Sequence, residues 1–244
     1  MIDFDPGTRT VARTGTTAVG AGQVPVGAGL TGQSSRTRAS MAAMVDVPTP
    51  HGPARVRMYG AGKPVGALVL GHGAGGGITA PDLREVVEVA TAQRCSVATV
   101  EQPYRVAGRR APAPARQLDT AWTAVLEFLM VGSLAGLPLV VGGRSSGARV
   151  ACRTASAVGA SAVLCLAFPL LPPRAAAPKS RQPELDAVRV PVLVVQGTRD
   201  RFGRPEPSAL RQVVVVPGDH SLDADLAAVG AAVRGWLPQV LSRG

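Results

Sequence analysis

The sequence predicts an α/β fold in which a mostly parallel central sheet is covered by helices on both faces. Three observations support this prediction. From about residue 54 onward, short apolar runs alternate with stretches of helical periodicity, which is typical of strand–helix–strand units. Most of these runs are continuously apolar, as expected of parallel strands that are buried on both faces. The 244 residues give room for one sizeable core domain.

The first half of the predicted domain combines an edge strand, two buried strands and one helix. Alternating side chains predict an edge strand over residues 55–59, and continuous apolar runs predict strands over 65–70 and 96–100. Pro81 suits the first turn of a helix, and apolar residues at helical spacing extend that helix over 82–93. A glycine loop over 71–77 follows the first buried strand, and a loop rich in Pro and Arg covers 102–114.

The second half continues the alternation to the C-terminus. We expect helices over 115–130, 148–158 and 222–241, and strands over 137–142, 162–168, 190–196 and 213–216. The interval from 168 to 190 is short and contains five prolines, so we expect no substantial cap and a fairly open site.

The N-terminal segment differs from the rest of the chain. Residues 1–43 are rich in Gly, Thr, Ser and Ala without sustained periodicity, which predicts a disordered low-complexity tail before a domain over residues 44–244. Asp3 and Asp5 stand where a signal peptide has basic residues, and no apolar core follows them. Met41 and Met44 supply later start positions, so the alternative that the tail is a start-site artefact stays open.

Composition excludes several classes of function. No apolar run approaches the roughly 18 residues that a membrane helix requires. Three cysteines without metal-like spacing predict buried free thiols in a reducing cytoplasm, and no metal or cofactor is expected. The net charge of +10 comes almost entirely from Arg, with no dense basic tract, zinc motif or aromatic stacking platform. We therefore expect a solvated basic surface, and neither a nucleic-acid nor a membrane partner.

The most informative motif is Gly-Arg-Ser-Ser-Gly at residues 143–147. A Gly-x-Ser-x-Gly between a buried strand and a helix is the pattern of a nucleophile elbow, in which a strained turn projects the serine hydroxyl above the sheet. Side chains are excluded two residues before and after the serine, because strand and helix nearly collide there. The motif predicts Ser145 as a nucleophile.

A serine nucleophile needs a base and a group that orients the base. Among the three histidines, only His220 follows the last predicted strand and comes late enough for the order serine, acid, histidine. Asp200 follows the apolar strand over 190–196 and is the predicted acid, although an aspartate there also suits a turn. Asp219 adjoins His220, but adjacent side chains diverge, so we expect it to point away.

Acyl transfer also needs donors for the developing oxyanion. The backbone N–H groups of Ser146 and Ala74 are the predicted donors, from the elbow and the glycine loop. His72 opens that loop and is predicted to shape it rather than to act as a base, and it remains a candidate substrate-binding residue. A phosphate cradle is the competing interpretation of the loop, but neither the Lys-Ser/Thr sequel nor a dinucleotide fingerprint is present.

With these features together, the chain resembles the α/β-hydrolase superfamily. More narrowly, it resembles small bacterial proteins of the dienelactone-hydrolase-like or uncharacterised α/β-hydrolase group, through the segments 70–76, 103–110 and 142–149. The resemblance extends from about Val45 to the C-terminus. The resemblance implies an α/β-hydrolase fold with Ser145 as nucleophile, His220 as base and Asp200 as its orienter. Dienelactone hydrolases themselves use a cysteine nucleophile, so their substrate is not implied for this serine.

These inferences predict a cytoplasmic serine hydrolase that acts on a small carboxylic ester or thioester through an acyl-enzyme. The alternative is a non-catalytic protein of the same fold that serves in interactions, although the intact order of the three residues argues against it. Arg105 lies in the loop over 102–114 and is a candidate for binding an acidic group of the substrate.

Overall fold

The computed structural model describes residues 40–172 and 179–242, and these residues form eight strands and six helices. The predicted tail lies outside the described residues up to residue 39, while residues 40–43 belong to the first strand. The strands are β1 (Ser40–Val47), β2 (Ala54–Gly60), β3 (Gly66–Gly71), β4 (Cys95–Glu101), β5 (Leu139–Arg144), β6 (Ala162–Leu166), β7 (Val192–Gly197) and β8 (Arg211–Val216). The helices are α1 (Pro81–Ala92), α2 (Pro103–Val106), α3 (Ala115–Val131), α4 (Ser146–Thr154), α5 (Gln182–Asp186) and α6 (Leu226–Leu241).

All eight strands belong to one sheet, in the order β1-β2-β4-β3-β5-β6-β7-β8. The strands from β4 to β8 along this order are parallel, whereas β2 is antiparallel to both β1 and β4. The sequence predicted β2 as an edge strand, and this is wrong because β1 covers its outer side. The unpredicted strand β1 is the edge.

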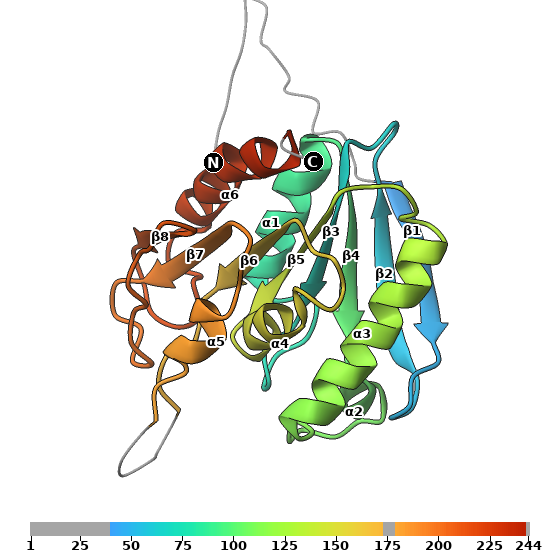
Figure 1. The fold of residues 1–244 in the computed structure, drawn as a ribbon, viewed down its shortest axis with the longest axis horizontal. Helices are drawn as coiled ribbons and strands as arrows, with labels where there is room; N and C mark the ends of the chain where they lie inside the picture. Colours follow the sequence, from blue (N-terminus) through green and yellow to red (C-terminus); the bar gives the residue numbers. More distant parts are fainter. Residues whose placement is uncertain (1–39, 173–178, 243–244) are drawn as a thin grey trace, which may run out of the picture. The chain divides into compact units, whose positions relative to one another are not determined.

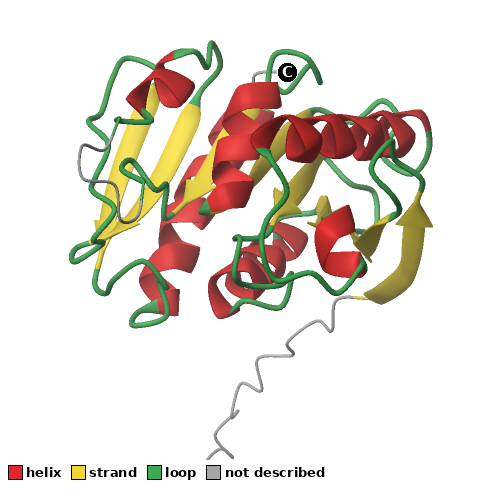
Figure 2. Ribbon diagram, turned by 90° about the horizontal axis from the view of Figure 1, so that it is seen from below, coloured by secondary structure: helices red, strands yellow, loops and turns green. Residues whose placement is uncertain are grey.

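Helices cover both faces of the sheet, as the sequence predicts (Figure 1). Helices α3, α4 and α5 pack on one face, and α1 and α6 pack on the other (Figure 2). Side chains of β3 alternate between the two cores: Ala67 and Val69 contribute to the first, while Leu68 and Leu70 contribute to the second. Because the strands are buried on both sides, their carboxyl ends are fixed rigidly, and the loops that leave them start from defined positions.

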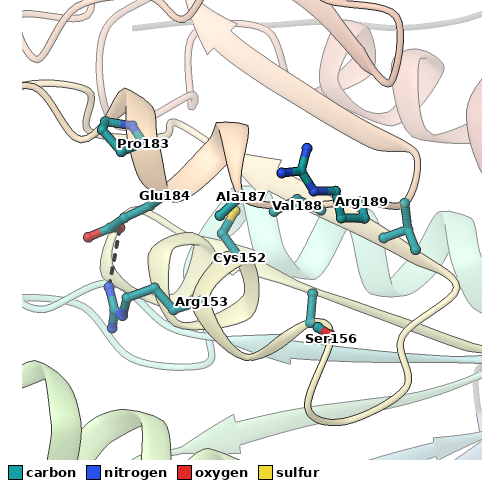
Figure 3. Close-up of a pocket in the computed structure, with 10 residues that line it drawn as sticks. Cys152, Arg153, Ser156, Pro183, Glu184, Ala187, Val188 and Arg189 are labelled. Atoms are coloured by element: carbon teal, nitrogen blue, oxygen red, sulfur yellow. Dashed lines mark hydrogen bonds and ion pairs between the residues drawn. The ribbon is translucent and has the colours of Figure 1, made fainter.

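Only the short helix α5 occupies the described part of the interval between β6 and β7, so no cap domain is seen there. A cavity of about 630 Å³ opens between α4 and α5, with Cys152 in its wall beside the ion pair of Arg153 and Glu184 (Figure 3). None of the predicted site residues lines this cavity. No helix in the described ranges is long and apolar enough to cross a membrane.

The three cysteines are free and buried. The Sγ atoms of Cys152 and Cys165 lie 3.5 Å apart between α4 and β6. Burial raises the pKa of Cys95 to about 11, so this thiol stays protonated at neutral pH. Within the described residues, no three His, Cys, Asp or Glu side chains gather in a way that could hold a metal ion.

Candidate active site

Ser145 lies at the sharp turn between β5 and α4, where the chain reverses from strand to helix. Its backbone has φ 52° and ψ −108°, a conformation that costs a non-glycine residue about 1–3 kcal/mol. The Ser145 N–H donates to the Leu166 carbonyl at the end of β6, over 2.9 Å. This hydrogen bond secures the strained turn to the neighbouring strand and leaves the side chain above the sheet.

The two glycines of the motif allow β3 to pass close to the turn. A Cβ added to Gly143 would lie 2.5 Å from the Gly71 carbonyl oxygen and 2.8 Å from the carbonyl carbon of Gly147. A Cβ added to Gly147 would collide with the same Gly71 oxygen and lie 2.9 Å from the His72 oxygen. The obstacles are backbone atoms, which cannot rotate away. The predicted exclusion of side chains at these positions is confirmed.

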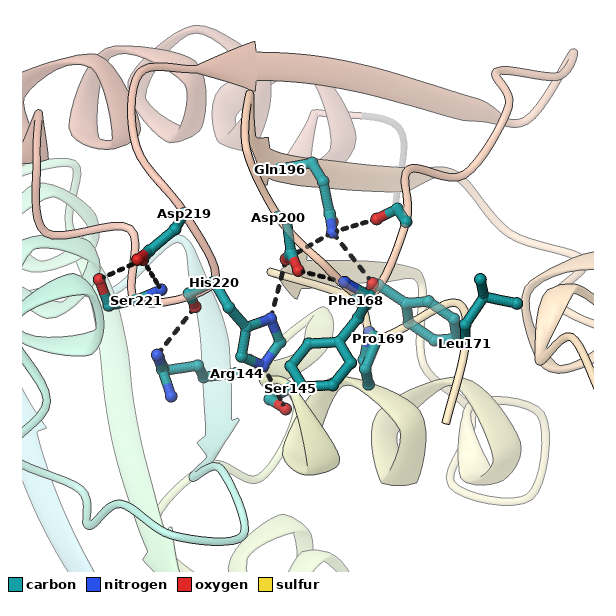
Figure 4. Close-up of polar contacts among 12 residues, drawn as sticks. Arg144, Ser145, Phe168, Pro169, Leu171, Gln196, Asp200, Asp219, His220 and Ser221 are labelled. Atoms are coloured by element: carbon teal, nitrogen blue, oxygen red, sulfur yellow. Dashed lines mark hydrogen bonds and ion pairs between the residues drawn. The ribbon is translucent and has the colours of Figure 1, made fainter. Parts of the chain in front are cut away.

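The structure brings Ser145, His220 and Asp200 into one hydrogen-bonded chain (Figure 4). His220 Nε2 lies 2.9 Å from Ser145 Oγ, and His220 Nδ1 lies 2.8 Å from Asp200 Oδ2. The three residues come from the loops after β5, β8 and β7. An imidazole between a hydroxyl and a carboxylate is able to take a proton from the hydroxyl while the carboxylate stabilises the resulting cation.

The Asp200 carboxylate is buried and receives hydrogen bonds on both oxygens. Its side chain is 1% exposed. Oδ1 accepts from the Phe202 N–H at 2.9 Å, and Oδ2 accepts from the Gln196 side-chain amide at 2.8 Å, besides its contact with His220. Asp219, as expected, points away from the ring and accepts from the backbone N–H and hydroxyl of Ser221. These bonds lower the pKa of Asp219.

His220 is held on its ring face and through its backbone. The Phe202 ring meets the imidazole edge to face, with ring centroids 4.4 Å apart. Arg144, the residue before the serine, donates from Nη2 to the His220 carbonyl over 2.9 Å. The same guanidinium pairs through Nε with Asp82 Oδ2 at 2.8 Å. Arg144 therefore links the elbow to α1 and to the loop that carries His220.

The glycine loop is fixed from behind by residues of the neighbouring loop after β4. His72 is 3% exposed; its Nδ1 lies 2.8 Å from the Gly73 carbonyl, and its Nε2 accepts from the Gln102 N–H at 3.1 Å. Burial lowers the pKa of His72, so the ring is neutral with its proton on Nδ1. Both nitrogens are engaged within the protein. The prediction that His72 shapes the loop fits this geometry, whereas its candidacy for substrate binding does not, because no ring nitrogen is left for a ligand.

The two predicted oxyanion donors belong to segments that adjoin the serine. Ser146 is the first residue of α4, where a backbone N–H has no acceptor within the helix. Gly73 runs close over the elbow, since a Cβ there would lie 3.6 Å from Ser145 Cβ. The next residue, Ala74, is fixed through its carbonyl, which accepts from the Tyr104 hydroxyl at 3.1 Å.

Arg105 lies on α2 and is partly buried. Its Nε atom is buried and meets no acceptor within the described part of the chain. Its charge makes a minor contribution to the lowered pKa of His72, after burial. The structure therefore places Arg105 beside the residues that support the glycine loop, and its contact with a substrate stays a prediction.

Sequence reasoning missed two polar side chains that support the site, the buried Gln196 and the partly buried Arg144. A signal for Gln196 was available, since it is the one polar side chain in the otherwise apolar strand β7. Arg144 occupies a variable position of the elbow motif, where side-chain identity carries no prediction. Its partner Asp82 was assigned only to the first turn of a helix. Nothing in the sequence indicates that Asp82 pairs with Arg144, which is 62 positions further along the chain.

Comparisons with known proteins agree with this fold. The alpha/beta hydrolase domain family matches residues 64–228. An α/β serine hydrolase homologue from Coxiella burnetii aligns with a TM-score of 0.67 and 14% identity, over 81% of this chain and 98% of that one. A lidless α/β serine hydrolase from Xanthomonas campestris aligns with a TM-score of 0.61 and 19% identity, over 82% and 96%. A dienelactone hydrolase from Anabaena variabilis aligns with a TM-score of 0.66 and 17% identity, over 81% and 96%.

No curated protein matches the sequence significantly. The structural likenesses are below 25% identity, so they show the shared fold. The family match covers more than half of the chain, and the protein therefore belongs to the alpha/beta hydrolase family.

Proposed function

We propose that this protein is a cytoplasmic serine hydrolase that cleaves a small carboxylic ester or thioester. The observation that carries the proposal is the hydrogen-bonded chain from Ser145 Oγ through His220 to Asp200, at 2.9 and 2.8 Å. Distances of this size permit proton transfer without rearrangement. The strained backbone at Ser145 supports the same conclusion, because such strain concentrates at functional positions.

In the proposed reaction, Ser145 Oγ attacks the substrate carbonyl carbon while its proton passes to His220 Nε2. The backbone N–H groups of Ala74 and Ser146 stabilise the oxyanion of the tetrahedral intermediate. The intermediate collapses, and His220 returns the proton to the leaving alcohol or thiol. Water then attacks the acyl-enzyme with His220 as base, and Ser145 is released with the acid product. Asp200 accepts a hydrogen bond from His220 Nδ1–H and stabilises the imidazolium each time it forms.

The reaction uses only a small-molecule substrate and water, with no cofactor. The free, buried state of Cys95, Cys152 and Cys165 supports a cytoplasmic location, because a reducing compartment keeps thiols unpaired. The lidless relative from Xanthomonas campestris is a serine hydrolase by its own description, which supports an open site that admits a small ester.

A fluorophosphonate probe tests the proposal without knowledge of the substrate, because it phosphonylates activated serines. We expect wild type and a Ser156→Ala control to be labelled and to hydrolyse p-nitrophenyl acetate. Ser145→Ala should lose labelling and lower kcat by about 10³-fold or more. Ser156 is an exposed serine just after α4 and matches the substitution chemically.

Circular dichroism would establish that each variant is folded. Absence of labelling in folded wild type, or equal labelling of Ser145→Ala, would reject the hydrolase and favour the non-catalytic alternative.

A further inference from the structure

The side chain of Gln196 is fully buried beside the candidate active site, at the end of β7. Its Nε2 atom lies near three oxygens: Asp200 Oδ2 at 2.8 Å, the Gly203 carbonyl at 2.9 Å and the Phe168 carbonyl at 3.1 Å (Figure 4). A buried primary amide costs free energy for each polar atom that lacks a hydrogen bond, and Gln196 Oε1 has no partner among the described residues. The arrangement therefore needs an explanation beyond packing.

The surroundings fix which way the amide points. All three neighbours are acceptors, so the amide nitrogen with its two hydrogens must face them. Turning the amide over would bring Oε1 against two carbonyls and a carboxylate and would leave the N–H groups without acceptors. The carbonyls of Phe168 and Gly203 belong to the segments that follow β6 and β7. They anchor the amide to two separate backbone segments.

Asp200 is the one acceptor of the three that is able to rotate. Its Oδ1 is held by the Phe202 N–H, and its Oδ2 is shared by His220 Nδ1 and Gln196 Nε2. Without the amide, Oδ2 would be held only by the imidazole that it is required to orient. With the amide, the carboxylate plane is set by the protein before His220 takes up a proton.

We propose that Gln196 is a positioning residue that acts through Asp200: its amide holds the carboxylate in the plane that receives His220 Nδ1–H. The proposal rests on the proposed hydrolase function. A neutral amide suits this task, because it orients the carboxylate without neutralising the negative charge that stabilises the imidazolium. A charged donor in its place would weaken that stabilisation.

The test compares Gln196→Met, which keeps the length of the side chain but removes the donor, with wild type. We expect kcat for p-nitrophenyl acetate, counted per site titrated with fluorophosphonate, to fall about 10- to 100-fold, as for loss of a hydrogen bond to a charged group. KM should stay unchanged, because Gln196 does not touch the substrate. Gln212→Met, an exposed position on the adjacent strand β8, serves as the matched control and should keep wild-type kcat.

A double-mutant cycle separates positioning from general support of the fold. The rate of fluorophosphonate labelling is compared in both backgrounds. Gln196→Met should lower this rate when Asp200 is present, but less than twofold in an Asp200→Ala background, because the carboxylate on which Gln196 acts is gone. An equal loss in both backgrounds would overturn the proposal, as would unchanged kcat in folded Gln196→Met. Failure of wild type itself to react would instead reject the hydrolase function.

If Gln196→Met does not fold, Gln196→Glu provides the same test with an isosteric side chain. Protonated Glu still donates one hydrogen bond, whereas ionised Glu repels Asp200. We expect its activity relative to wild type to decline as pH rises. A constant ratio across the pH range would contradict the positioning role.

Discussion

Replacing Arg144 with Met should destabilise the protein strongly, and in a way that depends on pH. The Arg144 guanidinium pairs with Asp82 at 2.8 Å. The Asp82 side chain is completely buried, while that of Arg144 is 16% exposed. Methionine keeps most of the stem but leaves the carboxylate without its partner. Breaking a buried pair on one side typically costs about 3–5 kcal/mol.

The ionisation of Asp82 sets an upper limit to this cost. Burial raises the pKa of Asp82, and the charge of Arg144 offsets part of this effect. Without Arg144, the Asp82 carboxyl group avoids an unpaired buried charge by binding a proton. Protonation at pH 7 takes place about three pH units above the ordinary carboxyl pKa of 3.8. Its free-energy cost is about 1.4 kcal/mol for each of these units. Protonation therefore limits the loss of unfolding free energy to about 4 kcal/mol at pH 7. Together with the usual range for a broken buried pair, we expect a loss of about 3–4 kcal/mol.

The sign of the pH dependence follows from the direction of the shift. A carboxyl group whose pKa is raised by folding favours the folded state at low pH, and this contribution is lost as pH rises through the folded-state pKa. Arg144→Met raises that pKa further. Its destabilisation should therefore shrink to about 1 kcal/mol as pH approaches 4.5.

Urea unfolding between pH 4.5 and 8 measures these values for wild type, Arg144→Met, Asp82→Asn and the double variant. The double variant should recover much of the stability, because it no longer leaves a buried charge without a partner. The exposed Arg204→Met is the control and should change stability by about 0.5 kcal/mol or less. A destabilisation that is independent of pH, or strict additivity in the double variant, would refute the reasoning.

Three further predictions concern the elbow and the glycine loop. Burial lowers the pKa of His72, so the free energy of unfolding should fall below pH 6.5 by up to about 1.4 kcal/mol per pH unit. In His72→Gln, the midpoint of urea unfolding should depend less on pH between 7.5 and 5. An equally steep dependence in this variant would contradict the prediction. Gly147→Ala should abolish fluorophosphonate labelling, whereas Gly75→Ala, with no atom within 4 Å of its added Cβ, should label normally. Ser146→Ala should lower kcat less than about tenfold, because only its backbone N–H is used; a larger loss would assign a role to the hydroxyl.

The buried strands were predictable because their sequences are apolar on both faces. Strands β3 to β7 along the chain have every or nearly every residue buried, so their runs stand out without reference to partners. Strand β1 has no such run. Its sequence, Ser-Met-Ala-Ala-Met-Val-Asp-Val, lacks a clean period of two, and its extended state depends on pairing with β2.

Helix ends differed from the prediction where side chains or turns override periodicity. Helix α6 begins at Leu226 rather than 222, because the Asp225 side chain caps it by accepting from the Ala228 N–H at 2.9 Å. Helices α2 and α5 were missed because Pro103 and Pro183 were taken as loop residues. Both prolines occupy the first turn, where a helix needs no backbone donor.

For the candidate site, chain order was enough to select Ser145, His220 and Asp200, since one serine has the motif and one histidine follows the last strand. Sequence could not select the supporting residues, because their roles depend on which loops the sheet order brings together. Gln196 contacts carbonyls that are 28 positions before and seven positions after it. Such a set of partners has no sequence pattern.

The supporting residues explain why the protein keeps buried polar groups near the strand ends. His72, Asp82 and Gln196 are each at most 3% exposed, and each joins two segments around Ser145 with hydrogen bonds or an ion pair. Apolar substitutes would pack there at no cost in desolvation, and replacement of buried pairs by apolar residues is often neutral or stabilising. Stability alone therefore does not require these side chains. The proposed hydrolase function does require fixed relative positions of the three loops, because in that reaction a proton moves efficiently between Ser145 and His220 only at hydrogen-bond distance.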